Sequence, residues 1–456
     1  MAITNTTGGS ARTAAGSGIR PGLQATPDAY TTLDLLIDPT KPDNRDLLIR
    51  AYGDQGLTGF IELTGAKKST ATADEVNWWE EGRLHKTFTY TAITEADPGV
   101  ITGTDLDALR LNDVLLLSDG QRVVVTVLTN STTISVRSLK GGSCAAQSGS
   151  FTGAVIGNIY AQGTNQPSKF YETSLTRYRN PLFITKEVFI VNGSQATNIG
   201  WVNVNGSYLW YHKNEMDARK RFMNQREMMM VFGQLTEATA KTIALASGSV
   251  TGSEGYFQAV EKRGIVADVS GGAQGTFASI TDMDQIILEL DKEGAPMEYA
   301  MYVDRRTSLD IDDLLAKGIA TQVTAGLPGQ FGAFNNDANM AIQLGFKSFT
   351  RGGYTFHKHD WKMLNDATIS GLTANGSLYK GAMIPLTTVA DAKTGERSPA
   401  LEMNYKAAGN YSRDMEHFIT GSILGYATDG EDVARFNYRS ECNLITRAAN
   451  QHVIIK

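Results

Sequence analysis

The sequence is short of the features that mark several common protein classes. Its 456 residues include only two cysteines, Cys144 and Cys442, which are too few for a disulfide framework and fit a reducing interior. The opening residues, 1–22, lack the apolar stretch of a secretory signal. No run of about 18 apolar residues occurs anywhere, so nothing predicts a membrane span. We therefore expect synthesis in the cytosol.

A surplus of positive charge is also missing. The chain has 42 lysines and arginines against 48 aspartates and glutamates, which gives a formal net charge of −6. Proteins that hold nucleic acid through its phosphates usually carry a basic surplus or a clear Lys/Arg cluster. Neither occurs here, so the sequence argues against tight DNA binding.

The composition is otherwise that of a folded protein. Hydrophobic residues make up 41% of the chain and charged residues 20%, which is enough for a sizeable core. The 46 glycines against 11 prolines favour long loops and β-structure. A chain of this length suggests two or three folded units.

Two sequence patterns resemble metal sites but are incomplete. His357 and His359 share one face of a predicted strand, yet the third ligand that a zinc site needs is missing. Asp310, Asp312 and Asp313 resemble part of a calcium loop, without the glycine and the final glutamate at the required offsets. We predict no metal and no cofactor.

Acid–base chemistry is the other candidate activity, at Glu80 and Glu81 near His85. Adjacent residues of a strand point to opposite faces, so these two carboxylates would not meet. Trp78 and Trp79 beside them fit an interface anchor better. No nucleophile elbow, phosphate-binding loop or dinucleotide motif occurs. The sequence therefore predicts no enzyme.

The N-terminal third divides into segments of different character. Residues 1–33 are rich in Gly, Ser, Thr, Ala and Asn and have little to pack, so order there would need contacts outside their own domain. Residues 58–90 have two alternating apolar ends around a polar tip, which predicts a long β-hairpin with Lys67 and Lys68 at its tip.

Residues 91–164 consist of short β-branched runs separated by turn signals, such as Asp119-Gly120 and Gly141-Gly142. This pattern predicts a small all-β barrel or sandwich. The segments on either side, 56–90 and 165–190, share a character of their own, so we interpret the β unit as an insertion into an excursion of the main fold.

A long helix is predicted over residues 208–232, roughly 37 Å in length. Apolar residues spaced by threes, fours and sevens define its expected buried face. The main stripe comprises Tyr208, Tyr211, Ala218, Phe222, Met229 and Phe232, and a second stripe comprises Leu209, Met216, Met223 and Met230.

Beyond this helix, helical and strand patterns alternate over residues 266–374, which is typical of an α/β or α+β domain. From about Tyr379 to the end the patterns are mainly strand-like. Residues 191–265 and 375–456 therefore appear as one domain interrupted by another. The fold class expected is α+β with an inserted all-β domain.

Together these segments resemble the major capsid proteins of tailed bacteriophages, whose fold is named for phage Hong Kong 97. The resemblance implies an N-terminal arm (1–55), an extended E-loop (56–90 and 165–190), a peripheral P-domain with a spine helix (191–265 and 375–456) and an axial A-domain (266–374). The stretch Trp78–Leu84, followed by a β insertion, is most similar to crAss-like phages and their podophage relatives.

The resemblance also implies partners and contact residues. Such proteins self-assemble as hexamers and pentamers into an icosahedral virion shell, with a portal and sometimes decoration proteins, around double-stranded DNA that they enclose without sequence-specific binding and without a membrane. Some members join an E-loop lysine to a neighbour's asparagine; Lys67 or Lys68 could supply that lysine, but the asparagine and the promoting glutamate cannot be placed. The expected inter-subunit contacts are Arg12, Arg20, Lys67, Lys68, Trp78, Trp79, Glu80, Glu81 and Arg83.

Two other functions stay open from the sequence. An encapsulin-type nanocompartment would keep the same fold but would enclose a cargo enzyme instead of DNA. A phage-associated enzyme with an accessory β domain would need a convergent pocket, and the sequence offers no such set of residues.

Overall fold

The computed structural model divides the chain into two units. Unit 1 draws on Met1–Asn77 and Arg179–Lys456, and unit 2 comprises Trp78–Tyr178. The structure describes residues 66–197, 210–237, 239, 241–246, 248–268, 280–312, 314, 347–366, 372–373, 376–386, 388–390, 395, 397–423, 428 and 430–456. The expected N-terminal arm, 1–55, lies outside these residues.

Unit 2 is built around a closed six-stranded barrel in the order β3-β4-β7-β6-β5-β8. Alternate residues such as Val123 and Val125 point inward and are fully buried, as the period of a strand requires. The sequence predicted either a barrel or a sandwich. Because the six strands close into a ring, the structure is a barrel. Its strands are β3 (Thr87–Ile93), β4 (Gly99–Thr104), β5 (Asp113–Leu116), β6 (Arg122–Asn130), β7 (Thr133–Ser138) and β8 (Gln147–Asn158).

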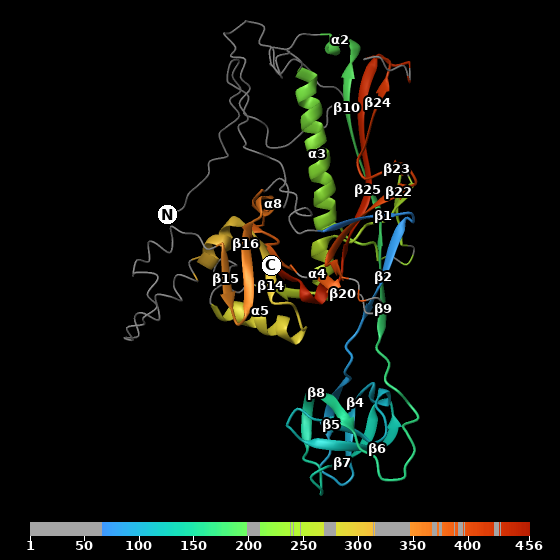
Figure 1. Ribbon diagram of the computed structural model, residues 1–456, viewed down its shortest axis with the longest axis vertical. Coiled ribbons are helices and arrows are strands. Elements are labelled where there is room, and N and C mark those ends of the chain that lie inside the picture. The colour runs from blue at the N-terminus through green and yellow to red at the C-terminus, as the bar shows by residue number, and fades with distance from the viewer. Residues whose placement is uncertain are drawn as a thin grey trace, which may run out of the picture. The chain divides into compact units, whose positions relative to one another are not determined.

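The first sheet of unit 1 has the order β1-β22-β25-β10, with β23 and β24 attached at its side. The long helix α3 (Trp210–Phe232) lies alongside β10, β24 and β25 (Figure 1). Phe222 of α3 is fully buried against Phe189, Phe436 and Tyr438 of this sheet. The strands are β1 (Lys67–Ala71), β10 (Phe183–Asn192), β22 (Leu401–Ala408), β23 (Tyr411–Ser412), β24 (Glu416–Gly421) and β25 (Val433–Thr446).

The second sheet of unit 1 is mixed, in the order β13-β26-β19-β14-β16-β15, and helix α5 (Ile280–Lys292) packs on it through Ile286 and Leu290. A core that includes Trp361, Leu401 and Ile454 joins the two sheets. The strands are β13 (Ile265–Ala267), β14 (Glu298–Val303), β15 (Ser348–Arg351), β16 (Tyr354–Asp360), β19 (Gly381–Pro385) and β26 (Val453–Ile455).

Smaller elements complete the described chain. No helix among the described residues is long and apolar enough to cross a membrane. Two strands, β2 (Glu75–Glu81) and β9 (Leu175–Pro181), pair as a separate ribbon. The remaining elements are η2 (Leu106–Ala108), α2 (Gly193–Ala196), β11 (Ile243–Leu245), β12 (Gly248–Val250), α4 (Tyr256–Arg263), α8 (Lys362–Asn365), β17 (Leu372–Thr373), β18 (Gly376–Ser377), β20 (Thr388–Ala390), β21 (Arg397–Pro399) and η3 (Ala449–Gln451).

The predicted hairpin over residues 58–90 is wrong. Strand β1 pairs in parallel with β22, whereas the next strand, β2, pairs with β9 in another sheet. Lys67 and Lys68 therefore belong to a sheet strand, opposite Glu402 and Met403, and do not form a hairpin tip. The alternating pattern predicted strands correctly but carried no information about their partners.

The helix expected over 208–232 begins at Trp210 in the described residues, and its second buried stripe is largely wrong. In the main stripe Ala218 and Phe222 are buried but Met229 is exposed, whereas in the second stripe Met216 and Met223 are exposed but Met230 is buried. Among the described residues the sheet covers one side of α3, and that side takes in part of each predicted stripe. Residues 208 and 209 lie outside the described range.

The expected boundaries of the domains also differ from the sheets observed. Strands β19 and β26, placed by the sequence with 375–456, pair with β14 and β13 of the 266–374 region and its border. The two regions thus share one sheet. In unit 2, the barrel strands run from Thr87 to Asn158, against an expected insertion of 91–164.

Candidate functional site

The base of the β2–β9 ribbon is tied to the core of unit 1 by Asn180. This residue is fully buried, and its side-chain amide donates to the carbonyl oxygens of Glu254 (2.9 Å) and Leu444 (2.7 Å). Its side-chain oxygen accepts from the Ser253 hydroxyl (3.0 Å) and the Glu254 amide (2.8 Å). All four hydrogen-bonding positions of the Asn180 side chain are used, so this end of β9 is fixed in the core of unit 1.

A second polar contact lies beside this anchor. The Arg179 guanidinium donates to Glu75 across the ribbon (2.9 Å) and to the carbonyl oxygen of Thr236 (3.3 Å). Both side chains are partly shielded from solvent. Arg179 thus links β9 both to β2 and to the segment that contains Thr236.

The two tryptophans of β2 have different environments. Trp78 is only 8% exposed, packs against Tyr178 with ring centroids 5.8 Å apart, and donates from Nε1 to Glu80 (3.0 Å). Trp79 is 63% exposed. Strand alternation separates them, so Trp79 can meet a partner and Trp78 holds its own strand in place. Trp78 is thus buried largely within its own chain, and its role as an inter-subunit contact stays a prediction.

The other predicted contact residues that the structure describes belong to different elements. Glu81 and Arg83 are exposed at the end of β2 and just beyond it. Lys67 and Lys68 are exposed on β1, which belongs to a different sheet. Glu80 is half-buried through its bond to the indole. Arg12 and Arg20 lie outside the described residues.

An apolar surface that the sequence reasoning missed lies on the sheet face opposite α3. Val188 of β10 and Phe418 of β24 both face Asn437 of β25 in the register, so all three share this side. Val188 is 47% exposed and Ile184, further along β10, is 53% exposed. We call Ile184, Val188 and Phe418 with their strands the open face.

Charged side chains also lie next to one another across the strands of the open face. Arg439 lies opposite Lys186 on one side and Glu416 on the other, and its Nε donates to Glu416 (2.7 Å). This hydrogen bond raises the pKa of Arg439 above its usual value, and the guanidinium also lies over the Phe418 ring at 5.4 Å. The side chain of Arg413 forms a similar bridge with Glu441 (2.7 Å). The open face thus combines apolar side chains with charged ones, of which Arg439 is paired with Glu416.

One sequence signal could have revealed this face. The strand Phe183–Asn192 carries apolar side chains at both parities, with Phe189 and Val191 on the helix side and Ile184 and Val188 on the other. Strands of this kind are typical of sheets that are covered on both faces. Among the residues that the structure describes, only the α3 side of this strand is covered.

The sites considered for chemistry resolve into structural contacts. The His357 imidazole lies 3.1 Å from Glu298, and His359 stacks on Tyr302. In the part of the chain that is described, no group of three or more His, Cys, Asp or Glu side chains could hold a metal. Cys442 is buried, and burial raises the pKa of its thiol.

Comparisons with known proteins give remote structural similarities. No protein-family model and no curated protein matches the chain. A chain from Mycobacterium phage Ogopogo is 5% identical, with a TM-score of 0.41 over 90% of this chain and 96% of that chain. A chain from the capsid structure of Cyanophage P-SCSP1u is 10% identical, with a TM-score of 0.37 over 94% of this chain and 98% of that chain. A chain from the mature capsid of bacteriophage PhiM1 is 8% identical, with a TM-score of 0.38 over 90% of this chain and 91% of that chain. At TM-scores below 0.5, these similarities decide neither the fold nor the function of this chain.

Proposed function

We propose that this chain is the major capsid protein of a tailed bacteriophage, with the Hong Kong 97 fold. It would self-assemble as hexamers and pentamers into an icosahedral shell that encloses a double-stranded DNA genome. The finer similarity to crAss-like phages and podophages belongs to the same proposal and rests on the stretch Trp78–Leu84 followed by a barrel.

The open face is the observation that carries this proposal. A three-stranded layer backed by one long helix leaves Ile184, Val188 and Phe418 in solvent. An apolar side chain of this size gains roughly 1.5–3 kcal/mol on going from full exposure to full burial. These three are about half exposed, so a second copy of the chain that covers them would gain about half of that from each. A shell multiplies such contacts because every subunit meets several neighbours through the same surfaces.

The β2–β9 ribbon supports the same function. Its base is held by Asn180, while Trp79 is exposed near its other end. Tryptophan is enriched among residues that contribute most to binding energy at protein interfaces. The ribbon therefore corresponds to the E-loop that the capsid resemblance implies, with Trp79 as its anchor on a neighbouring subunit.

The charge balance suits a container for DNA. A shell built from chains with a formal net charge of −6 would enclose a genome without binding its phosphates strongly. On this proposal the partners are further copies of the chain, a portal and possible decoration proteins, in a virion made in the host cytoplasm.

Sedimentation of the purified chain, followed by nuclease digestion of any particle, tests the proposal. Particles that protect double-stranded DNA, or that need phage packaging proteins to fill with it, support a capsid. Particles that instead contain a co-purified enzyme would favour an encapsulin-type compartment. A chain that stays monomeric at all concentrations would contradict both.

A further inference from the structure

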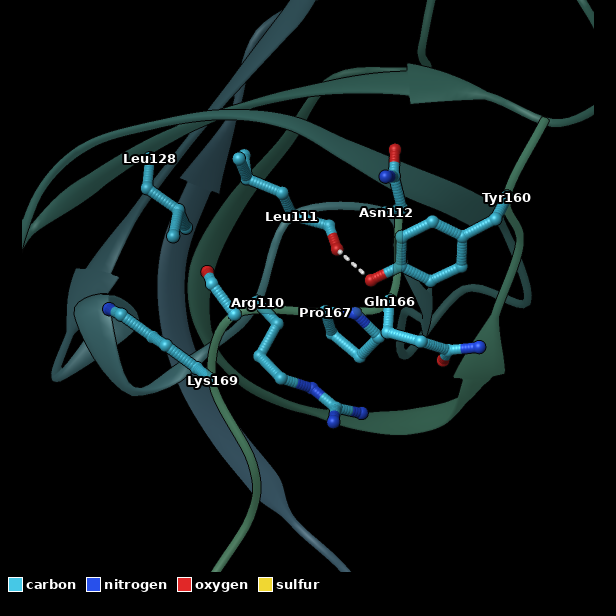
Figure 2. A pocket seen from close by; sticks show the side chains of 9 residues that line it. Arg110, Leu111, Asn112, Leu128, Tyr160, Gln166, Pro167 and Lys169 are labelled. Carbon is cyan, nitrogen blue, oxygen red and sulfur yellow. Dashed lines mark hydrogen bonds between the residues drawn. The ribbon is translucent and has the colours of Figure 1, made fainter. Parts of the chain in front are cut away.

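A pocket of about 240 Å³ lies at one end of the barrel in unit 2, where β5 begins and β8 ends (Figure 2). Its walls come from the segment Arg110–Asn112, from the end of β6 and from the segment Tyr160–Lys169. Ligand pockets for drug-sized molecules measure about 300–1,000 Å³. This volume is therefore suited to one small ring and its substituents.

One part of the pocket wall is apolar and flat. Tyr160 holds its ring in place by donating its hydroxyl to the carbonyl oxygen of Leu111 at 3.3 Å (Figure 2). Leu111, Leu128 and Pro167 add aliphatic surface. A saturated ring could lie against these four side chains, since they offer carbon surface without a competing charge.

The polar side chains of the pocket have hydrogen-bonding capacity to spare. Asn112, Gln166 and Ser168 make no side-chain hydrogen bond to any described residue. Asn112 has a φ of 67°, a left-handed conformation that asparagine tolerates better than most residues. Amides and hydroxyls both donate and accept, so they match sugar hydroxyl groups, which do the same.

Positive charge completes the pocket. Arg110 stacks on the Tyr171 ring at 4.0 Å and faces Asp113 at 3.3 Å, and its buried Nε has no hydrogen-bond partner among the described residues. Lys169 makes only a long contact, 3.5 Å, to the carbonyl oxygen of Asp107. No carboxylate lines the pocket. Asp113 offsets the charge of Arg110, so the cation available to a ligand carboxylate is Lys169.

From this lining we propose that the pocket binds one acidic sugar unit, a pyranose ring that carries a carboxylate. The ring would lie against Tyr160 and the aliphatic wall, its hydroxyls would bond to Asn112 and Gln166, and its carboxylate would pair with Lys169. This inference is independent of shell assembly, because every residue involved lies within unit 2.

Saturation-transfer NMR on the full chain tests the proposal, with glucuronate as the acidic probe, glucose as its neutral counterpart and acetate as the bare carboxylate. We expect glucuronate to bind at least tenfold more tightly than glucose or acetate. Lys169→Gln should weaken glucuronate binding roughly tenfold, the loss of one charge-assisted hydrogen bond, and leave glucose binding unchanged. Lys140→Gln, at an exposed barrel lysine outside the pocket, is the matched control and should change nothing.

Three results would overturn the inference. The first is no transfer to glucuronate up to about 10 mM, far weaker than ordinary ligand binding. The second is equal binding of glucose or acetate, which would remove the need for an acid or for a ring. The third is an unchanged glucuronate affinity in Lys169→Gln, which would place the ligand elsewhere.

Discussion

At the scale of single residues, Asn180 is the position where one side chain holds several segments together. Replacing it by alanine leaves two carbonyl oxygens and a backbone amide without partners in the core. We expect Asn180→Ala to lower the free energy of unfolding by about 3 kcal/mol. Urea titration of the variant measures this, with Asn165→Ala, at an exposed asparagine, as the control expected to stay within about 0.5 kcal/mol. Equal stabilities of the two variants would contradict the anchoring role.

His452 gives a second residue-scale prediction, on pH. Its ring is fully buried, accepts or donates one hydrogen bond with the Tyr256 hydroxyl (3.2 Å), and burial lowers the pKa to about 3. Because the unfolded chain takes up this proton near pH 6.5 and the folded chain does not, stability is full above pH 6.5 and falls as pH drops toward 3.

The wild type should thus lose about 1 kcal/mol more than His452→Gln between pH 6.5 and 5.5. Urea midpoints at the two pH values measure the difference. His85→Gln, at an exposed histidine, should keep the wild-type dependence. A wild-type slope in His452→Gln would show that this imidazole is not the group responsible.

At the scale of elements, two adjacent residues of β2 are expected to affect different properties, one the stability of the chain and the other its assembly. Trp78→Ala removes a buried ring from the β2–β9 ribbon and should cost about 3 kcal/mol of stability. Trp79→Ala should leave the unfolding curve unchanged but reduce the amount of assembled particle. Calorimetry and sedimentation of both variants test this pair, and a Trp79→Ala variant that assembles fully would remove Trp79 from the interface.

The open face makes a related prediction. Val188→Glu places a charge among exposed apolar side chains, so the single chain should fold normally while assembly is lost, because each interface would have to bury a carboxylate. Leu139→Glu, at a comparably exposed leucine of the barrel, is the control and should assemble. Intact shells from Val188→Glu would mean that the open face meets no neighbour.

The sequence predicted elements better than it predicted their partners. The spacing of Ala218 and Phe222 located the long helix, and the short β-branched runs located the barrel. The pairing of β2 with β9 could not be read locally, because about a hundred residues separate the two strands. The exposure of Met216 follows from which side of α3 the sheet covers, a tertiary fact. Of the expected contacts, Trp79 is exposed and Trp78 is buried in its own chain, and an interface at either residue stays a prediction.

At the scale of the whole molecule, the barrel has the features of an inserted domain. It has its own core, and the chain enters and leaves at neighbouring points, where the Gly82 amide donates to the carbonyl oxygen of Ser174 at 2.8 Å. Domains inserted in this way can fold alone. We expect residues 78–178, expressed separately, to unfold cooperatively in urea; a disordered fragment in solution NMR would contradict this.

On the proposed function, copies of this chain close into a shell. Electron microscopy of the purified protein, taken from a size-exclusion column, tests it most directly. We predict uniform closed particles, or hexameric and pentameric rings, in which a neighbouring subunit covers the open face. A clean monomer that never assembles, even with phage scaffolding factors supplied, would contradict the proposal.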